Sequence, residues 1–193
     1  MIRIDKRIGL FRWLPNGSQV VEIGSWRGYF AVELLELKNL KHVTLVDAWE
    51  NIDEEHNESA MKECLSNIRG HVPGGRVSVI RKRSLDAVQN FKDKSLEAVY
   101  IDAAHDYENV LADLRAWSKK VKRYGFIFGH DFVQNDALNF GVIEAVHEFC
   151  KESNWRLHAL TSEEFPSFAL RYIEPIPKII HQFWEGMMPE KIR

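Results

Sequence analysis

Two short segments of this sequence place an aspartate close to a histidine directly after an apolar run. Asp102 and His105 follow one run, and His130 and Asp131 follow the next. A histidine can take a proton from a substrate hydroxyl because its pKa lies near neutrality. Carboxylate oxygens suit Mg²⁺ or Ca²⁺, and an added imidazole shifts the preference toward Mn²⁺, Fe²⁺ or Zn²⁺. These residue types therefore predict acid–base chemistry, metal binding or both.

The same four side chains also have interpretations without chemistry. Asp102 could cap the helix that begins near Tyr107, because aspartate is a favoured capping residue. His105 could be an ordinary loop histidine, His130 could be hydrogen-bonded inside the wall of the fold, and Asp131 could be a turn residue. Both kinds of interpretation stay open on the sequence alone.

The segment from Val20 to Gly28 could bind a nucleotide-like ligand. It reads Val-Val-Glu-Ile-Gly-Ser-Trp-Arg-Gly, an apolar run with an acid near its end, a turn with two glycines and then an apolar helix. Glycines let the backbone approach a ligand closely. Asp47 ends the next apolar run, roughly twenty residues on, where nucleotide-binding α/β folds place a ribose-binding carboxylate. The segment lacks the three-glycine spacing of a dinucleotide site, which disfavours a nicotinamide-dependent oxidoreductase.

The elements that must position these residues alternate between strands and helices. The pattern predicts strands over 20–23, 43–46, 77–81, 96–101 and 126–128, helices over 30–37, 54–68, 85–91, 107–121 and 140–149, a turn at Tyr124-Gly125, and two final strands over 155–160 and 168–173. Five β–α units followed by a hairpin predict a Rossmann-like, doubly wound, seven-stranded sheet with one antiparallel strand and helices on both faces. Ligands bind beyond the carboxyl ends of such strands, where Gly24, Asp47, Asp102 and Asp131 all fall.

Composition excludes several classes of partner. The 193 residues carry a formal net charge of −2, which argues against nucleic acid or an anionic membrane as the partner. The 2 cysteines do not form a metal-type pair. No run approaches the about 20 apolar residues of a membrane span, and Met1 to Leu14 lacks the apolar core of a leader peptide. We expect a cytoplasmic protein, and a homo-oligomer is compatible with this composition.

Four segments together resemble one group of methyltransferases. They are Val-Glu-Ile-Gly-Ser-Trp-Arg-Gly (21–28), Val-Asp-Ala-Trp (46–49), Val-Tyr-Ile-Asp-Ala-Ala-His-Asp-Tyr-Glu-Asn-Val-Leu-Ala-Asp-Leu (99–114) and Gly-His-Asp-Phe (129–132). The chain is similar to class I S-adenosylmethionine-dependent enzymes, in the branch of macrolide-sugar O-methyltransferases and cephalosporin-hydroxylase-like proteins. The resemblance covers roughly Val20 to Tyr172, and its most specific part is the Asp-x-x-His-x-Tyr-x-x-Val stretch.

This resemblance implies a cofactor site for S-adenosylmethionine and a role for each matching residue. The methionine part would contact Glu22, Gly24, Ser25 and Gly28, the ribose would bind Asp47, the adenine would lie near Ala48, Trp49, Arg83 and Ser84, and Asp102 would also border the cofactor.

The same resemblance implies the catalytic groups. His105 would be the base that deprotonates the acceptor hydroxyl, and Asp102 and Asp131 would bind Mg²⁺ or another divalent cation, as in the metal-dependent members. Family members often carry Asp or Gly where this chain has Ala103-Ala104. A third carboxylate ligand is therefore missing, and His130 could substitute for it.

The C-terminal tail resembles a different family. Ile176 to Pro189 reads Ile-Pro-Lys-Ile-Ile-His-Gln-Phe-Trp-Glu-Gly-Met-Met-Pro, which is similar to the opening of sugar-nucleotide glycosyltransferases with an Asp-x-Asp motif. We therefore expect a methyltransferase domain over 1–173, a linker and the start of a fused glycosyltransferase over 174–193, and a sugar or glycan as the methyl acceptor. Two alternatives stay open: an amphipathic tail that packs on the methyltransferase, and a non-catalytic cofactor-binding module that assists a glycosyltransferase.

Overall fold

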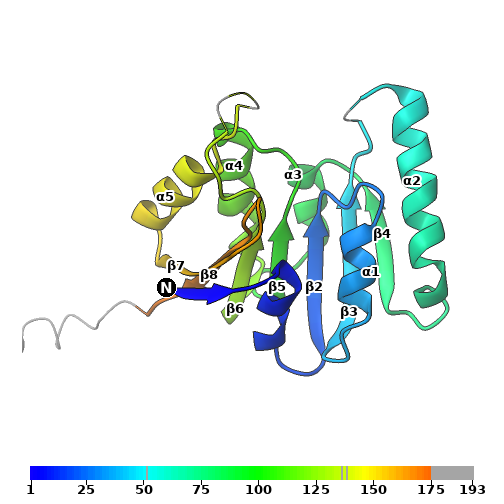
Figure 1. Cartoon of the computed structure of the whole chain (residues 1–193). Coiled ribbons are helices and arrows are strands. Elements are labelled where there is room, and N and C mark those ends of the chain that lie inside the picture. Colours follow the sequence, from blue (N-terminus) through cyan, green and yellow to red (C-terminus); the bar gives the residue numbers. More distant parts are fainter. Residues whose placement is uncertain (51, 136, 138, 175–193) are drawn as a thin grey trace, which may run out of the picture.

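A single mixed sheet forms the centre of the molecule (Figure 1). The structure is a computed structural model and describes residues 1–50, 52–135, 137 and 139–174. The strands are β1 (Ile2–Ile4), β2 (Ser18–Ile23), β3 (Leu40–Asp47), β4 (Val77–Arg81), β5 (Leu96–Ile101), β6 (Val121–Gly129), β7 (Trp155–Thr161) and β8 (Phe168–Tyr172). The helices are α1 (Tyr29–Leu35), α2 (Glu54–Ile68), α3 (Ser84–Ala87), α4 (Tyr107–Trp117) and α5 (Val142–Glu152), with short 3₁₀ turns η1 (Arg7–Trp13), η2 (Arg69–His71) and η3 (Val88–Asn90).

The strand order confirms the predicted doubly wound topology. It runs β1-β7-β8-β6-β5-β2-β3-β4, and β8 is antiparallel to both of its neighbours while the other pairs are parallel. From β2 the chain builds outward to β3 and β4, then returns to place β5 on the other side of β2. The strand order reverses between β2 and β5, and sheets of this kind bind ligands beyond the carboxyl ends of the strands at such a reversal.

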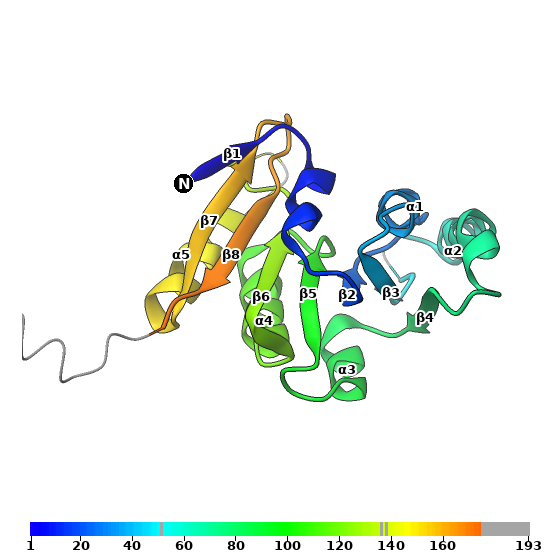
Figure 2. The ribbon, with the colours of Figure 1, turned by 90° about the horizontal axis from the view of Figure 1, so that it is seen from below.

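Helices cover both faces of the sheet, as Figure 2 shows. The turn η1 lies on the same side as α1 and α2, whereas α3, α4 and α5 cover the opposite face. Helix α5 illustrates why: Val142, Ala145, Val146 and Phe149 are its buried residues. They recur at the three- and four-residue spacing of one helix face, which the sheet then covers.

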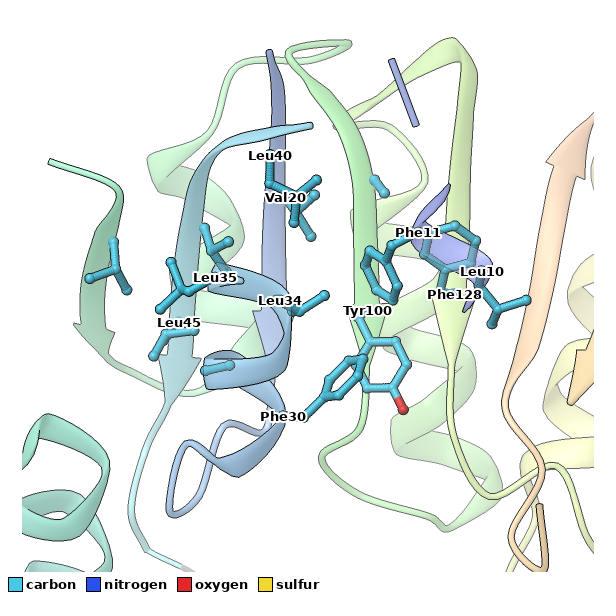
Figure 3. Close-up of a cluster of buried hydrophobic side chains, with 14 of the residues drawn as sticks. Leu10, Phe11, Val20, Phe30, Leu34, Leu35, Leu40, Leu45, Tyr100 and Phe128 are labelled. Carbon is cyan, nitrogen blue, oxygen red and sulfur yellow. The ribbon is translucent and has the colours of Figure 1, made fainter. Parts of the chain in front are cut away.

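An aromatic cluster fastens the N-terminal segment to the first of these faces (Figure 3). The ring of Phe11 in η1 lies 4.6 Å from that of Phe128 and 5.7 Å from that of Phe30, centroid to centroid. The Phe30 ring in turn lies 4.6 Å from that of Tyr100. Rings at these separations contribute beyond their buried area. Leu10 and Phe11 of the N-terminal segment are thus part of the core.

The sheet has eight strands rather than the predicted seven, because the N-terminus adds one. Strand β1 pairs in parallel with β7, with Ile2 opposite Ala159. A strand of 3 residues is too short to show alternation, and its partner lies at the far end of the sequence. No local pattern could therefore reveal it.

The prediction was also wrong around Tyr124-Gly125, which lies inside β6 and is not a turn. Helix α4 ends at Trp117, and β6 already begins at Val121. A Cβ atom on Gly125 would lie 2.3 Å from the carbonyl oxygen of Glu97, next to an irregularity in the β5–β6 register. Glycine is required here because the two strands approach each other closely. In the sequence, such a glycine cannot be distinguished from one that forms a turn.

Two further expectations concern the C-terminal segment and the presence of membrane-spanning helices. The glycosyltransferase-like segment and the rest of 175–193 lie outside the described residues, so the division into two domains stays a prediction. Among the helices that the structure describes, none combines the length and the apolar content needed to cross a bilayer.

If the N-terminal segment is part of the core, truncating Phe11 must destabilise the protein. Phe11 is fully buried, so Phe11→Ala should lower the free energy of unfolding by about 3–5 kcal/mol. Arg12→Ala, at the exposed neighbouring position, should change it by less than about 0.5 kcal/mol. Urea denaturation followed by circular dichroism measures both. Equal stabilities for the two variants would contradict this account.

Candidate active site

The turn after β2 brings the backbones of β2 and β5 into contact. Gly24 has a φ of +86°, and a Cβ atom there would lie 2.0 Å from the carbonyl oxygen of Asp102. The N–H of Gly24 donates to the carbonyl of Val46 at 2.9 Å, and the N–H of Asp102 donates to that of Ile23 at 2.8 Å. Only glycine fits both the left-handed conformation and the contact. The ends of three strands therefore meet at this point.

Two buried polar atoms beside this turn have no hydrogen-bond partner in the described part of the chain. They are Oε2 of Glu22 and Oγ of Ser25. Burial, followed by the negative charge of Asp102, raises the pKa of Glu22 to about 8. Buried polar atoms are almost always hydrogen-bonded, so these two are suited to receive a ligand's polar groups.

Asp47 ties the glycine turn to the end of β3. Its Oδ2 accepts the N–H of Trp26 at 2.8 Å, and its Oδ1 accepts the N–H of Trp49 at 2.7 Å. The indole N–H of Trp49 donates to the carbonyl of Trp26 at 2.8 Å. Both tryptophans have positive φ, 44° and 51°, a costly backbone conformation for large side chains. The carboxylate stabilises this arrangement.

The predicted adenosine contacts lie around this turn to different extents. Asp47 and Trp49 are buried and Ala48 is half-buried. Burial raises the pKa of Asp47, although its backbone hydrogen bonds act to lower that pKa. A carboxylate has about four lone-pair sites, so Asp47 can still accept a ribose hydroxyl. Its ribose-binding role stays a prediction.

Gly28 directly precedes α1 and has a φ of +75°. A Cβ atom there would lie 2.9 Å from Sγ of Cys64.

Arg83 and Ser84 are placed differently from the rest of the predicted cofactor residues. The guanidinium of Arg83 is exposed and pairs with Glu50 at 2.9 Å. The hydroxyl of Ser84 donates to Oδ1 of Asp113 at 2.5 Å and accepts the indole N–H of Trp117 at 2.8 Å. The Ser84 hydroxyl therefore joins α3 to α4. Its role beside the adenine stays a prediction.

The predicted acids and histidines do meet at the carboxyl ends of β5 and β6. Asp131, which has a φ of 56°, lies between two imidazoles: its Oδ2 is 2.9 Å from Nδ1 of His105, and its Oδ1 is 2.9 Å from Nδ1 of His130. The His130 Nδ1 is also 3.6 Å from Oδ1 of Asp102. The four side chains form one cluster, as their positions after neighbouring strands predicted.

The surroundings shift the pKa values of the two aspartates in opposite directions. Burial raises the pKa of Asp102 to about 6, although His130 and Arg7 favour its charged form. Burial also acts to raise the pKa of Asp131. The hydrogen bonds from His105 and His130 outweigh this effect and hold the pKa of Asp131 well below its usual range. The Asp131 hydrogen bond raises the pKa of His105 in return. Since ionised Asp131 can only accept, Nδ1 of His105 carries the proton.

Three of these side chains could hold a metal ion. One ligand atom from each of Asp102, His105 and Asp131 lies within 4.8 Å of the others. This set contains His105, whereas the sequence suggested His130 as the ligand beside the two aspartates. Two carboxylate oxygens and one imidazole nitrogen fit a divalent cation by donor type. The two carboxylate oxygens of Asp131 also accept hydrogen bonds from both imidazoles. Cation binding and the orientation of the histidines would therefore use the same atoms.

Arg7 is a residue of this site that sequence reasoning missed. Its Nη1 lies 3.5 Å from Oδ2 of Asp102 and 3.5 Å from the hydroxyl of Tyr100. Its guanidinium carbon lies 4.1 Å above the centre of the Phe30 ring, a cation–π contact. Arg7 arrives through the N-terminal segment, and the sequence around it carries no motif that could have indicated this.

A comparison with family models is consistent with these residues. A model described as a methyltransferase domain matches residues 21–132, a range that includes the glycine turn, Asp47 and the whole acid–histidine cluster. No curated protein matches the sequence.

Solved structures show the same fold at low sequence identity. A SAM-dependent methyltransferase from Methanosarcina mazei is 13% identical, with a TM-score of 0.65 over 89% of this chain and 100% of that one. An O-methyltransferase family protein from Burkholderia thailandensis is 14% identical, with a TM-score of 0.59 over 88% of this chain and 54% of that one. Spermidine synthase from Thermotoga maritima is 18% identical, with a TM-score of 0.62 over 92% of this chain and 62% of that one. Different reactions use this fold, so function must be argued from the site.

Burial of Glu22 should make the cofactor-free protein less stable as the pH rises. Between pH 4.5, the ordinary pKa, and about 8, the folded state holds a proton that the unfolded state has lost, so the free energy of unfolding falls with rising pH. Glu22→Gln should therefore raise that free energy by about 2–4 kcal/mol at pH 8 and by less than about 1 kcal/mol at pH 4. Urea denaturation at both values checks this. Glu108→Gln, at an exposed position on α4, is the control. A gain independent of pH would show that Glu22 is already ionised.

Proposed function

The chain belongs to the methyltransferase-domain family, and from that premise we propose that it methylates a hydroxyl of a sugar or glycan with S-adenosylmethionine as the donor. One observation carries the proposal: Glu22 and Ser25 are buried beside each other, and Oε2 of Glu22 and Oγ of Ser25 make no hydrogen bond to any other described residue. Both lie at the same edge of the sheet as a histidine hydrogen-bonded to an ionised aspartate. The first pair is suited to hold a cofactor, and the second is suited to remove a proton from a hydroxyl. The sugar acceptor is supported by the two sequence resemblances.

The residues at the glycine turn fit the cofactor. Glu22 offers a carboxylate to a cationic ligand group, and Ser25 offers a hydroxyl; each lacks another partner in the described residues. Gly24 keeps this surface free of a side chain, so that backbone can approach the ligand. S-adenosylmethionine supplies a methyl group that is already electrophilic. The main task of the protein is then to position the acceptor oxygen.

His105 is the group that we assign as the base. Its Nδ1–H donates to Asp131, which leaves Nε2 with a free lone pair in the neutral ring. The imidazole is partly exposed, so an acceptor hydroxyl can reach it. Nε2 would accept the hydroxyl proton, and S-adenosylmethionine would supply the methyl group to the oxygen, its methyl–sulfur bond breaking to leave S-adenosylhomocysteine. Asp131 then stabilises the imidazolium, as an orienting aspartate does in other base-assisted enzymes.

A divalent cation is the further cofactor that this cluster could use. Asp102, Asp131 and an imidazole would hold it, and it would supply a lower pKa for the acceptor hydroxyl. Mg²⁺ is the first ion to test, since two of the three donors are carboxylates.

The proposal is tested by binding and product formation together. Calorimetry should show that S-adenosylhomocysteine binds, and mass spectrometry should show a methylated product from at least one of a panel of methyl glycosides, each assayed with Mg²⁺ and with EDTA. Binding without transfer under either condition would favour a non-catalytic module. Binding of NAD without binding of S-adenosylhomocysteine would favour an oxidoreductase.

Removal of the proposed base should slow the reaction. We expect His105→Ala to lower turnover by roughly 10²–10⁴-fold with little change in affinity for S-adenosylhomocysteine, because the imidazole acts on the acceptor. His147→Ala, at an exposed position on α5, serves as the matched control. A His105→Ala enzyme that retains the full rate would remove His105 from the mechanism.

Asp47 should matter for the cofactor rather than for turnover. Asp47→Ala removes the acceptor of two backbone N–H groups in the turn as well as the proposed ribose contact. We expect the dissociation constant of S-adenosylhomocysteine to rise at least about tenfold, the equivalent of about 1.4 kcal/mol. The control is Asp93→Ala, whose carboxylate is exposed and pairs with Lys120. An unchanged constant for Asp47→Ala would contradict the ribose role.

A further inference from the structure

A pocket of about 380 Å³ lies between the N-terminal segment and the loop from β7 to β8. Lys6 and Arg7 line it on one side, and Glu163, Glu164 and Phe165 line it on the other. Its volume falls within the range of small-molecule sites, about 300–1,000 Å³. None of the cofactor residues proposed above lines it. A second ligand could therefore occupy it while the cofactor is bound.

The two walls of this pocket are joined by hydrogen bonds. The backbone N–H of Arg7 donates to Oε2 of Glu163 at 2.8 Å, and the N–H of Ser162 donates to the carbonyl of Ile4 at 2.9 Å. Beyond them β1 pairs with β7, and both views show these segments side by side (Figures 1 and 2). Glu163 thus holds the pocket together, whereas Glu164 has an exposed side chain.

The pocket adjoins the proposed base. His130 lines it, and the Nδ1 of His130 lies 2.9 Å from Asp131, the same carboxylate that orients His105. An aromatic series leads back from the opposite wall: the Phe165 ring lies 6.4 Å from that of Phe140, which lies 4.9 Å from the His105 ring. A molecule in this pocket would therefore contact His130 and lie beside the cluster that contains the proposed base.

The lining suits a neutral ring that carries several hydroxyls. Lys6 and Arg7 can only donate hydrogen bonds, whereas the carboxylates of Glu33 and Glu164 can only accept. Each hydroxyl can do both, and the mixed charges disfavour a strongly anionic or cationic ligand. Phe165 is 36% exposed. The negative face of its ring attracts the slightly positive C–H groups on one side of a sugar ring.

From this chemistry we propose that the pocket is the acceptor site, that Phe165 is the surface on which a sugar ring stacks, and that Glu164 selects hydroxylated rings. This inference rests on the proposed function and adds to it the location of the acceptor and two specificity-determining residues. The Arg7–Glu163 hydrogen bond gives the site its width, because it fixes the distance between the two walls.

The test measures sugar binding to protein that is already loaded with S-adenosylhomocysteine. Saturation-transfer NMR with methyl glycosides of glucose, galactose, mannose and rhamnose gives a dissociation constant for each. For the glycosides that bind, we expect Phe165→Ala to raise the constant at least tenfold, Glu164→Gln to raise it about threefold to tenfold, and Phe165→Tyr to retain binding, the magnitudes following those of an aromatic contact and a charged hydrogen bond. Tyr124→Ala is the control, since Tyr124 is an exposed aromatic side chain in β6 that does not line the pocket. S-adenosylhomocysteine affinity should stay unchanged in every variant.

Each other outcome has a distinct meaning. Glycosides that bind the loaded wild-type protein equally in Phe165→Ala and Glu164→Gln would overturn the acceptor pocket and leave the proposed function standing. Loaded protein that binds none of the glycosides would overturn the ligand class. Failure to bind S-adenosylhomocysteine at all would instead contradict the proposed function.

Discussion

The close approach of Gly24 to the carbonyl of Asp102 is the constraint on which the rest of the site depends. A Cβ atom at this position would lie 2.0 Å from that oxygen, so no other residue allows β2 and β5 to end side by side. Because they do, buried Glu22 lies near Asp102, and the negative charge of Asp102 contributes to the raised pKa of Glu22. This contact brings the glycine turn and the acid–histidine cluster to the same edge of the sheet.

The sequence predicted those parts of the fold whose signals are local. Helix α2 and strands β4 and β5 have the predicted bounds, because apolar spacing and flanking turn residues mark them. The cluster of Asp102, His105, His130 and Asp131 also formed as expected, since neighbouring parallel strands end at the same edge. What could not be predicted depends on distant partners. Strand β1 exists through its pairing with β7, and the position of Arg7 depends on both.

The charged side chains of the site lie beside partners of opposite charge. Asp131 accepts from two imidazoles, and Arg7 lies beside Asp102 while its guanidinium stacks on Phe30. Removing one partner from such a group usually costs more than the pair contributes, since the other charge is left buried. Glu22 is the exception, because it is buried and forms no ion pair with any cationic side chain that the structure describes. A positively charged ligand would satisfy this carboxylate, which is consistent with a sulfonium cofactor that also carries an amino group.

The pairing of β1 with β7 has a consequence for how the protein matures. The first strand leaves the ribosome long before its partner has been synthesised, since Arg7 and Glu163 are separated by 156 positions. Pairings between such distant segments form slowly because the intervening loop must first be closed. The central strands can assemble before the last hairpin is made, whereas the wall between the N-terminal segment and that hairpin closes only after β7 and β8 have been synthesised. The pocket proposed for the acceptor is therefore completed later than the central strands of the sheet.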